Sequence, residues 1–566
     1  MSQFYDQSSL VFLPSGYKSG KLYSQKPLST DGELTFTRNS NATRVNADGL
    51  VEKVRTNLAL YSQALTTPWT NGGGTFTANN QIGPDGVANS ASTFTHSNAN
   101  SRYQTFTGVS GQPYTFSIYV KGDVAHDAFI TAGVIGSLTN YNFSVTTEWQ
   151  RFSMTVTPAA TNCVIGIYAS NDSTVRTIYV ANAQLETGDI ATDYIATTSA
   201  AVSVGPTANL PRIDYTGSAC GKLLLEPQTT ALNSYSEQLD NAYWTPANCS
   251  VTANQTASPS GYVDAELILD NNSNQQHVIY KSIGITSGNK YTGSFFIKEA
   301  GYTTAAVRMG NGALWTGGGG PTVEFDLIAL TGTVVDGSGV TYTIEDYGNG
   351  WRRCSVTGTC VTSGNTAFSL YLKQYSAYTG NGTSGVYAWG ANITATSYLQ
   401  SYIPTLGASV TRLGDMVGKS AFPTSILNTT TAHSGFFELK PNATETSGFQ
   451  VFGFDDNTYS SYIKIYADTT GRHRLAAASG GSSGVSAWGV ANQYNKFAWS
   501  YDGAGNVKFF CNGVASVNYS ITLNAMTYFG AGEKSLQTNH TSQSFKQILL
   551  FNSKLTDAQL AELTTL

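Results

Sequence analysis

The sequence predicts an all-β protein made of tandem β-sandwiches, and three observations lead to that prediction. One stretch of the chain is duplicated, the composition suits strands and tight turns, and short alternating segments recur between turn residues. The duplication is weighed first because a repeated module sets the architecture of the whole chain.

The duplicated stretch has a fixed spacing. A Glu is followed six residues later by a Leu, and that Leu is followed three residues later by a Tyr-Ser pair. So many identities at one spacing indicate two copies of one β-domain. The Glu, Leu and Tyr are Glu52, Leu58 and Tyr61 in the first copy and Glu226, Leu232 and Tyr235 in the second.

The two copies continue to match each other further along the chain, but the second copy is longer. The offset between them is 174 residues at the start of the repeat and 208 at Tyr194 and Tyr402. The largest insertion lies between Lys298 and Trp351 and includes a run of four glycines. We therefore expect both modules to share one strand order, with the extra residues mainly in one hairpin region.

The composition favours strands and argues against several classes of function. Charged residues make up 12% of the chain, where roughly 25% is usual, while 33 Tyr and many Thr, Asn and Gly suit strands and turns. The net charge is −5, so the chain lacks the excess of Lys and Arg that binds phosphate backbones, and we expect no nucleic-acid partner. There is no secretory signal and no apolar run of 18 residues, so we expect no membrane span and folding in a reducing cytoplasm.

The cysteines and histidines form no recognisable metal or redox motif. None of the six Cys belongs to a C-x-x-C pair, and we interpret them as ordinary buried thiols. The six His show no metal-ligand spacing.

The first element in chain order is an N-terminal segment, residues 1–49. Residues 10–13 form a short apolar strand that ends at Pro14 and Gly16, and residues 35–38 alternate. The segment has too few large apolar residues for a core of its own. We therefore expect it to pack on the first module or on another chain.

Residues 50–200 form the first module. Its strands are short, they alternate at residues 114–119 and 152–156, and turn signals such as Gly83-Pro84-Asp85-Gly86 separate them. Even hairpin spacing without an apolar period of 3.6 residues predicts a two-sheet sandwich of the jelly-roll type. Residues 201–223 contain Pro206 and Pro211 and are predicted to be a linker.

Residues 224–412 form the second module, and residues 413–566 form a third sandwich of another kind. In this tail, residues 461–466 alternate cleanly, and residues 497–513 form a hairpin. The chain closes on a strand and a short helix. For that helix Thr556 is the expected N-cap, with Gln559 at the capping-box position.

The ends of the repeats carry a resemblance to a known family. Residues 57–69 and 183–195 are similar to the start and end patterns of carbohydrate-binding jelly-roll modules of the xylanase and glucanase type. The second copy departs from that pattern, because residues 392–394 read Asn-Ile-Thr where the first copy has Gln-Leu-Glu. The resemblance implies that such modules often hold a structural Ca²⁺, although the sequence does not fix its ligands.

The two ends of the chain carry further resemblances, and together with the repeats they cover nearly the whole chain. Residues 499–502, 512–513 and 549–557 resemble a concanavalin A-like, laminin-G-type domain, which implies a lectin. Residues 12–17 and 37–45 resemble bacteriophage fibre and tail proteins that carry such modules.

Taken together, these resemblances imply a virion structural protein, a head fiber or tail fiber that binds bacterial surface glycans for host attachment. The chain would then assemble in the host bacterial cytoplasm as a homotrimer. Residues 1–49 would anchor it to capsid or tail proteins, with residues 413–566 held outward. Two alternatives stay open: a decoration or spacer protein that binds no glycan, and a depolymerase of capsule polysaccharide.

Aromatic side chains near loops are the candidate sugar-binding residues. Lectins stack an aromatic face on the apolar side of a pyranose and surround it with amide and carboxylate groups. The alternative for each aromatic is a place in the core, which the repeated pattern favours for Trp149 and Trp351. The candidate sugar-binding residues are Trp69, Trp244, Trp315, Tyr378 and Trp488.

No carboxylate constellation supports catalysis, so we expect no enzyme activity. A glycosidase needs two carboxyl groups about 5–10 Å apart, one of them with a raised pKa. Of the neighbouring pairs, only Glu324 and Asp326 alternate onto one face of a strand. The other two pairs are Glu345 with Asp346 and Asp455 with Asp456, and both indicate turns.

Overall fold

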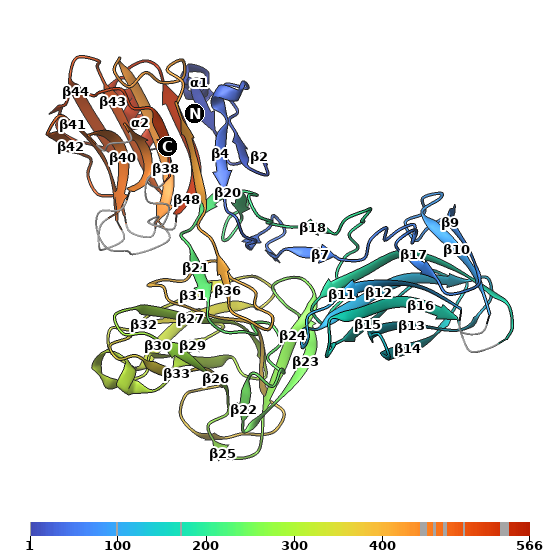
Figure 1. The fold of residues 1–566 in the computed structure, drawn as a ribbon. Coiled ribbons are helices and arrows are strands. Elements are labelled where there is room, and N and C mark those ends of the chain that lie inside the picture. Colours follow the sequence, from blue (N-terminus) through green and yellow to red (C-terminus); the bar gives the residue numbers. More distant parts are fainter. Residues whose placement is uncertain are drawn as a thin grey trace. The chain divides into compact units, whose positions relative to one another are not determined.

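The fold is all-β, as the sequence predicts. In the described part of the chain there are many antiparallel strands and two short α-helices, α1 (Ser2–Gln7) and α2 (Asp557–Thr565) (Figure 1). Neither of these described helices is long and apolar enough to cross a membrane. The computed structural model describes residues 2–97, 100–169, 173–441, 450–456, 460–467, 472–490, 493–531 and 543–565.

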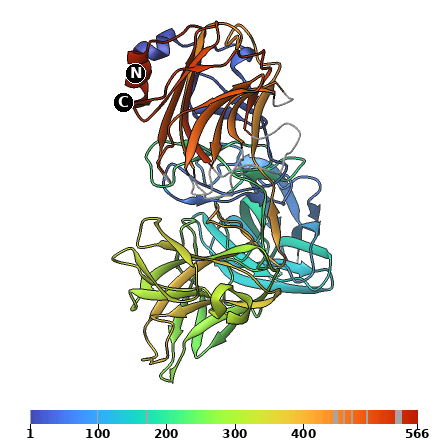
Figure 2. The same ribbon diagram turned by 90° about the vertical axis from the view of Figure 1, so that its left-hand side faces the viewer.

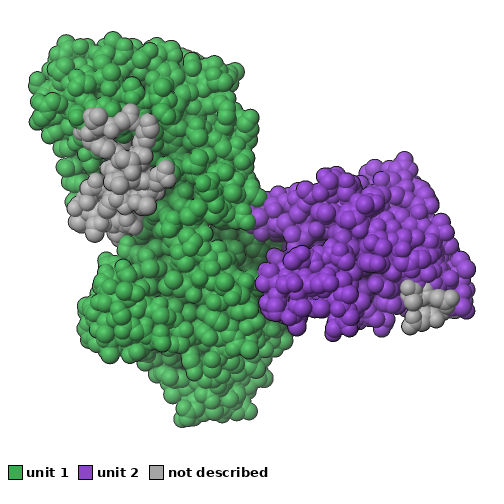
Figure 3. Space-filling view, in the orientation of Figure 1, with its two compact units in different colours: residues 1–53, 206–566 green, residues 54–205 purple. Residues whose placement is uncertain are grey.

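The chain divides into two compact units (Figure 3). Residues 54–205 form one unit, and residues 1–53 with 206–566 form the other. The first unit contains module one, and the second contains module two and the tail domain.

Module one is a sandwich of two five-stranded antiparallel sheets, ordered β15-β12-β17-β10-β9 and β14-β13-β16-β11-β8. Alternate side chains of each strand face the other sheet, so that Phe116, Ile118 and Val120 are fully buried. The strands are β8 (Thr70–Asn71), β9 (Thr75–Gln81), β10 (Ala91–His96), β11 (Ser101–Thr107), β12 (Tyr114–Gly122), β13 (His126–Val134), β14 (Ser137–Val145), β15 (Gln150–Val156), β16 (Asn162–Ala169) and β17 (Arg176–Thr187).

Module two repeats this strand order. The main paths of its sheets run β23-β24-β35-β27-β32-β31 and β22-β26-β33-β28-β29-β30, and each path is the module-one order plus one edge strand, β31 or β30. Strands β21 (Thr229–Ala231) and β36 (Val410–Arg412) also join the first sheet. The added strands lie between Lys298 and Trp351, which confirms the predicted location of the insertion. The strands are β22 (Thr245–Ala247), β23 (Cys249–Ala257), β24 (Val263–Asp270), β26 (Val278–Ile285), β27 (Lys290–Ala300), β28 (Thr304–Met309), β29 (Thr322–Asp326), β30 (Thr331–Asp336), β31 (Thr341–Asp346), β32 (Arg352–Thr359), β33 (Gly364–Leu372) and β35 (Gly385–Thr394).

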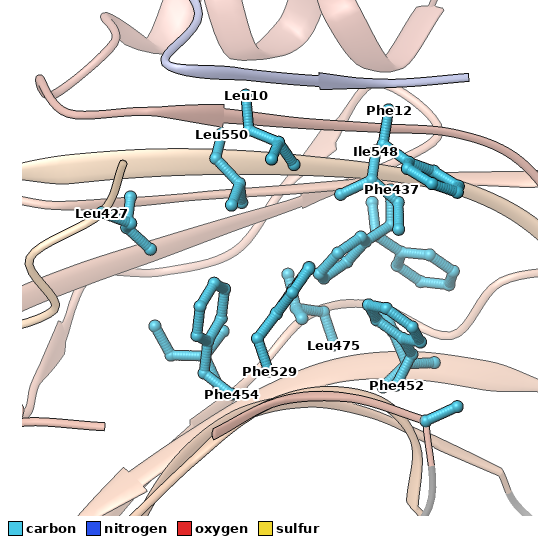
Figure 4. Close-up of a cluster of buried hydrophobic side chains, with 14 of the residues drawn as sticks. Leu10, Phe12, Leu427, Phe437, Phe452, Phe454, Leu475, Phe529, Ile548 and Leu550 are labelled. Atoms are coloured by element: carbon cyan, nitrogen blue, oxygen red, sulfur yellow. The ribbon is translucent and has the colours of Figure 1, made fainter. Parts of the chain in front are cut away.

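The tail domain is a third sandwich with larger sheets, ordered β19-β20-β48-β38-β43-β44-β45 and β2-β3-β4-β37-β47-β39-β40-β41-β42. Its core is rich in Phe, and the rings of Phe454 and Phe529 stack with centroids 4.3 Å apart (Figure 4). Its later strands are β37 (Met416–Ser420), β38 (His433–Pro441), β39 (Gln450–Asp455), β40 (Ser461–Ala467), β41 (His473–Ser479), β42 (Ser482–Val485), β43 (Asn495–Tyr501), β44 (Asn506–Cys511), β45 (Val514–Ala515), β47 (Tyr528–Gly530) and β48 (Gln543–Phe551).

The N-terminal segment packs on the tail domain, which corrects the expectation that it packs on module one or on another chain. Strand β1 (Leu10–Phe12) pairs with β48, and β4 (Leu34–Thr37) pairs with β37. Leu10 and Phe12 point into the tail core beside Ile548 (Figure 4). Both views place the two chain ends side by side (Figures 1 and 2). Residues 1–49 are therefore part of the tail domain, and their predicted role as a virion anchor stays a prediction. The remaining N-terminal strands here are β2 (Gly16–Lys18) and β3 (Lys21–Tyr23).

The predicted linker, residues 201–223, is also structured. Strands β19 (Arg212–Asp214) and β20 (Lys222–Leu225) pair with each other, and β20 pairs with β48 of the tail domain. The linker prediction is therefore wrong for this stretch, because the Pro residues that suggested it only flank the strands. Cys220, in the turn between the strands, is exposed and does not fit the prediction of buried thiols.

A buried ionic cluster lies where the N-terminal segment, β19, module two and the tail domain meet. Arg212 Nη1 contacts Glu226 Oε2 at 2.7 Å, and Arg38 Nη1 contacts Asp415 Oδ1 at 2.9 Å. Arg412 Nη1 lies 3.4 Å from Glu226 Oε2, and Arg212 also pairs with Asp415. All five side chains are at most 3% exposed. The cluster therefore ties segments that are far apart in the sequence.

The closing helix α2 begins as predicted. The backbone N–H of Gln559 donates to Thr556 Oγ1 at 3.3 Å, and the N–H of Thr556 donates to Gln559 Oε1 at 2.9 Å. This reciprocal pair satisfies two N–H groups that would otherwise lack partners, which is why the helix starts here. Leu555 and Leu560 are both buried in the small cluster beneath the helix.

Candidate functional site

Four of the five aromatic residues predicted to bind sugar are buried, which contradicts that prediction. Trp69, Trp244, Trp315 and Tyr378 are between 1% and 8% exposed, so their rings cannot stack on a ligand. Each indole N–H of the three Trp donates to a backbone carbonyl of the same module, as expected for buried Trp. These residues hold the sandwiches together.

The remaining Trp residues are divided between surface and core. Trp488 is half-buried, and the guanidinium groups of Arg472 and Arg474 lie 5.1 and 4.5 Å from its ring centroid. Trp351 is 1% exposed, which confirms the core prediction, whereas Trp149 is half-buried beside Lys121 and does not fit it. The position of Trp488 is compatible with the predicted sugar contact.

Module one presents a different set of aromatic residues on its outer surface. On β13, Ala128 and Ile130 point into the core, so Phe129 between them points away from it. Phe129 is paired in register with Tyr168 on β16, and the two rings stack with centroids 5.3 Å apart and 17° between their planes. We call the following set face one: Tyr103, Phe129, Thr131, Asn140, Asn142 and Tyr168.

The other members of face one follow from the register of the same sheet. Asn142 is opposite Phe129, Asn140 is opposite Thr131, and Thr131 Oγ1 donates to Asn140 Oδ1 at 2.7 Å. Both Asn side chains are exposed, while the aromatic rings are half-buried. Face one thus places polar amides beside accessible aromatic surface.

A glycine leaves room for the two tyrosines of face one. Gly166 is opposite Tyr103 on one side and Thr131 on the other. A Cβ at this position would lie 2.8 Å from Tyr103 Cβ and 3.1 Å from the Tyr168 ring. Burial raises the pKa of the Tyr168 hydroxyl, and a hydrogen bond to Ser101 partly opposes this. The phenol therefore stays protonated and can donate a hydrogen bond.

The corresponding surface of module two also carries tyrosines. Ser369 is opposite Tyr280 on one side and Arg308 on the other, just as Gly166 is opposite Tyr103 and Thr131 in module one. The same register places Tyr371, which is 9% exposed, where module one has Tyr168. Tyr371 and Tyr375 pack edge to face with ring centroids 5.2 Å apart. We call the following set face two: Tyr280, Arg308, Glu324, Tyr371 and Tyr375.

Face two is charged where face one is neutral. Glu324 occupies the register position of Asn142, and Arg308 occupies that of Thr131. The Arg308 guanidinium lies 4.4 Å from the Tyr375 ring centroid and 3.3 Å from Asp336 Oδ2. Glu324 Oε1 accepts the N–H of Tyr375 at 2.9 Å, and burial raises the pKa of this carboxyl group. The two faces therefore have one scaffold and different polar groups.

The carboxylate pairs considered for catalysis have separate surroundings. Asp326 Oδ1 accepts the N–H groups of Ile328 and Ala329 and closes a turn, while Glu324 belongs to face two. Asp346 pairs with Arg352 at 2.6 Å, whereas Glu345 lines a cavity, and Asp455 is 1% exposed. Glu345 and Asp346 lie on strand β31, so the prediction of a turn there is wrong.

The described residues offer no clear metal site. Among them, no group of three or more His, Cys, Asp or Glu side chains is placed to hold a metal ion. The structural Ca²⁺ that the jelly-roll resemblance implies stays a prediction. No step is assigned to a metal.

No protein-family model matches the chain, and no curated protein matches it in sequence. Among solved structures, it is similar to the binding domain of botulinum neurotoxin DC in complex with rat synaptotagmin II, with 12% identity, 27% of this chain covered and a TM-score of 0.22. The chain spans 40% of the length of that domain.

Two carbohydrate-binding modules (CBMs) are also similar. The CBM40 of the Ruminococcus gnavus IT-sialidase, bound to α2,3-sialyllactose, has 11% identity and a TM-score of 0.22 and covers 26% of this chain and 92% of its own. The CBM22-1–CBM22-2 tandem domain of a Paenibacillus barcinonensis protein has 13% identity and a TM-score of 0.22 and covers 60% and 97%. At TM-scores near 0.2, none of these similarities assigns a function to the chain.

The sequence analysis missed both faces because it considered aromatic residues near loops and not those on strands. The available signal was an aromatic residue in an outward position of an alternating strand, as in Ala128-Phe129-Ile130. In an alternating strand, odd-numbered and even-numbered side chains point to opposite faces of the sheet. The face that meets the solvent can be assigned only when the residues that form the core are known.

Proposed function

We propose that the chain binds glycans on bacterial surfaces through face one and face two, as a structural head or tail fibre of a bacteriophage virion. The observation that carries the glycan proposal is the register-equivalent pair of half-buried tyrosines, Tyr103 and Tyr280. Both lie on the same sheet of their module, and the Phe129–Tyr168 stack of module one has no such exposed counterpart at Tyr371, which is 9% exposed.

The chemistry of the faces suits sugars. The C–H groups of a pyranose ring pack on an aromatic face, and amide and hydroxyl groups bond its hydroxyls. Face one supplies the Phe129–Tyr168 stack with two exposed Asn side chains, which suits neutral sugars. Face two supplies Arg308 and Glu324, which suits sugars that carry charged substituents.

Glycan-array binding of the full chain tests the proposal. We expect Tyr103→Ala to weaken binding to the preferred neutral glycan by at least about tenfold, because truncating an aromatic anchor typically costs more than about 1.4 kcal/mol. Tyr141→Ala is the matched control, since Tyr141 is 46% exposed and alternates to the other side of edge strand β14 from Asn140 and Asn142 of face one. Equal binding by both variants and the unchanged chain would rule out face one.

The virion assignment rests on the resemblance of residues 12–17 and 37–45 to phage fibre proteins. Because residues 1–49 complete the tail domain, we propose that this combined domain, rather than a free N-terminal arm, contacts capsid or tail proteins. Antibody labelling of purified particles tests the location. Sedimentation of the full chain tests the homotrimer, and a monomer at micromolar concentration would exclude it.

We also propose that the chain binds glycans without cleaving them. The support is that Glu324 already accepts a backbone N–H and Asp326 closes a turn. Incubation with host polysaccharide should release no reducing ends. Release that disappears in Glu324→Gln would favour the depolymerase alternative, and a chain that binds no glycan at all would favour the spacer alternative.

A further inference from the structure

A cavity of about 510 Å³ lies within the larger compact unit, and no residue of face one or face two lines it. Its walls come from the N-terminal segment, the β19–β20 hairpin, strands β31 and β32 with residues 397–402 of module two, and the tail domain. Cavities of roughly 300–1,000 Å³ hold small ligands. This one has room for one or two sugar rings.

The lining of the cavity is rich in charge. Four cationic side chains line it, and one of them, Arg44, is paired with Glu52 at 2.7 Å. The other three are Lys222, Arg353 and Lys440. Of its three carboxylates, Glu226 belongs to the buried ionic cluster, which leaves Asp214 and Glu345. The unpaired groups therefore leave an excess of one positive charge.

Most of these groups are held in place by neighbours. Asp214 accepts the N–H groups of Val45 and Thr216, both at 2.9 Å, and Lys222 Nζ donates to the carbonyl of Thr216 at 2.5 Å. Arg353 Nη1 donates to the carbonyl of Gln400 at 2.8 Å. These contacts give the cavity a fixed set of polar groups.

Lys440 is different. It is half-buried at the end of β38, and within the described part of the chain its ammonium group has neither a hydrogen bond nor an ion pair. Glu345 lies close enough to feel the charges of Lys440 and Arg353. The ammonium group of Lys440 can therefore donate to the carboxylate of a bound ligand in a charge-assisted hydrogen bond.

We propose that this cavity binds a small saccharide that carries a carboxylate, such as a uronic acid. The carboxylate of the ligand contacts Lys440, its hydroxyls donate to Glu345 and Asp214, and the phenol rings of Tyr347 and Tyr494 border the sugar. The site is separate from face one and face two. It rests on the proposed glycan-binding function and adds to it a separate site for acidic sugars.

Isothermal titration calorimetry of the full chain with D-glucuronic acid tests the proposal. Glucose, which lacks the carboxylate, is the uncharged control ligand. We expect one molecule bound per chain and at least tenfold weaker binding of glucose. Lys440→Gln should weaken binding of the acid by at least about tenfold, or about 1.4 kcal/mol, whereas Lys440→Arg should retain it. Lys496→Gln is the matched control, a half-buried lysine of the same domain outside the cavity.

The location is tested by hydrogen exchange, where glucuronic acid should protect residues 341–347 and 397–402. Double substitution of Tyr103 and Tyr280 by Ala should leave this binding unchanged, so failure of the faces and failure of the cavity are distinguishable. Equal affinity for glucose and glucuronic acid, or equal losses in Lys440→Gln and Lys496→Gln, would overturn the proposal. So would the absence of binding, or protection confined to other residues.

Discussion

At the scale of single residues, the buried ionic cluster is the most consequential arrangement in the larger unit. Asp415 accepts hydrogen bonds from Arg38 and Arg212 and also from the backbone N–H of Glu226. Its neighbours include three arginines and only one other carboxylate, Glu226. Because the cluster is excluded from water, each carboxylate is needed to balance the guanidinium groups around it.

Removing one of these carboxylates should strongly destabilise the unit. Asp415→Asn leaves three buried arginines with a single counter-charge, and we expect a loss of about 3–5 kcal/mol in the free energy of unfolding. Denaturant unfolding measures this. Asp346→Asn is the control, because it breaks a pair with Arg352 in which Asp346 is 52% exposed, and it should cost less than about 1 kcal/mol. Similar losses in both variants would contradict the assigned importance of the cluster.

The cluster also predicts how stability depends on pH. Burial alone raises the pKa of Glu226, but attraction from Arg412 and Arg212 and hydrogen bonds from Ser401 outweigh it and lower the pKa to about 2. A carboxyl group with a lowered folded-state pKa stabilises the fold above its ordinary pKa of 4.5 and loses that contribution as the pH falls toward 2.

Urea unfolding between pH 5.5 and pH 2.5 tests this. The difference in unfolding free energy between the unchanged chain and Glu226→Gln should shrink as the pH falls below about 4.5. For the exposed Glu148→Gln the difference should stay constant. A constant difference for Glu226→Gln would show that this carboxylate is not stabilised in the fold.

At the scale of elements, the N-terminal strands show how a segment without a core of its own becomes part of one. Leu10, Phe12, Leu22, Leu34 and Phe36 are all at most 1% exposed, and every one of them packs in the tail core. The segment contributes alternating apolar residues to two sheets that the tail alone leaves incomplete. The tail domain is therefore assembled from both ends of the chain.

A single substitution in β1 should reveal this dependence. Phe12→Ala removes a ring that is 1% exposed, and we expect a loss of about 3–5 kcal/mol in the unfolding free energy of the larger unit. Leu28→Ala lies in the same segment at a residue that is 90% exposed and should change stability by no more than about 0.5 kcal/mol. If Phe12→Ala were as mild as Leu28→Ala in denaturant unfolding, the N-terminal strands would not be part of the tail core.

At the scale of the whole molecule, the two repeats differ in their independence. Module one is closed at its base by pairing of β7 (Arg55–Asn57) with β18 (Val202–Val204), and it forms a compact unit by itself. Module two begins and ends at Glu226 and Arg412, which both belong to the buried ionic cluster. The same β-domain is thus self-contained in one copy and integrated in the other.

Expression of separate pieces tests this difference. Residues 54–205 alone should fold and unfold cooperatively, with a melting temperature close to that of the same unit in the full chain. Residues 224–412 alone should melt at a lower temperature than in the full chain, because they lack Arg38, Arg212 and Asp415. Thermal unfolding followed by circular dichroism measures both. A module-two piece as stable as its parent unit would remove the proposed role of the cluster.

The candidate site could be predicted only in part from the sequence. Trp69 and Trp244 were predicted to bind sugar because they lie near loops, but nearness to a loop does not decide whether a ring faces the solvent, and both rings are buried. Face one and face two depend on residues from different strands, such as Tyr103 and Tyr168, that only sheet register brings together. Lys440 and Glu345 meet at the cavity from separate domains.

The sequence by itself determined the properties that depend on local pattern. Period-two alternation, turn residues and the duplicated spacing were sufficient for the all-β class, the common strand order of the two modules and the location of the insertion. Only the tertiary structure decided which core receives residues 1–49, that residues 212–225 pair in the tail sheet, and which aromatic rings face the solvent. Alternation is a local property of a strand, whereas pairing partners and the buried face are settled by the free energy of contacts between residues far apart in the chain.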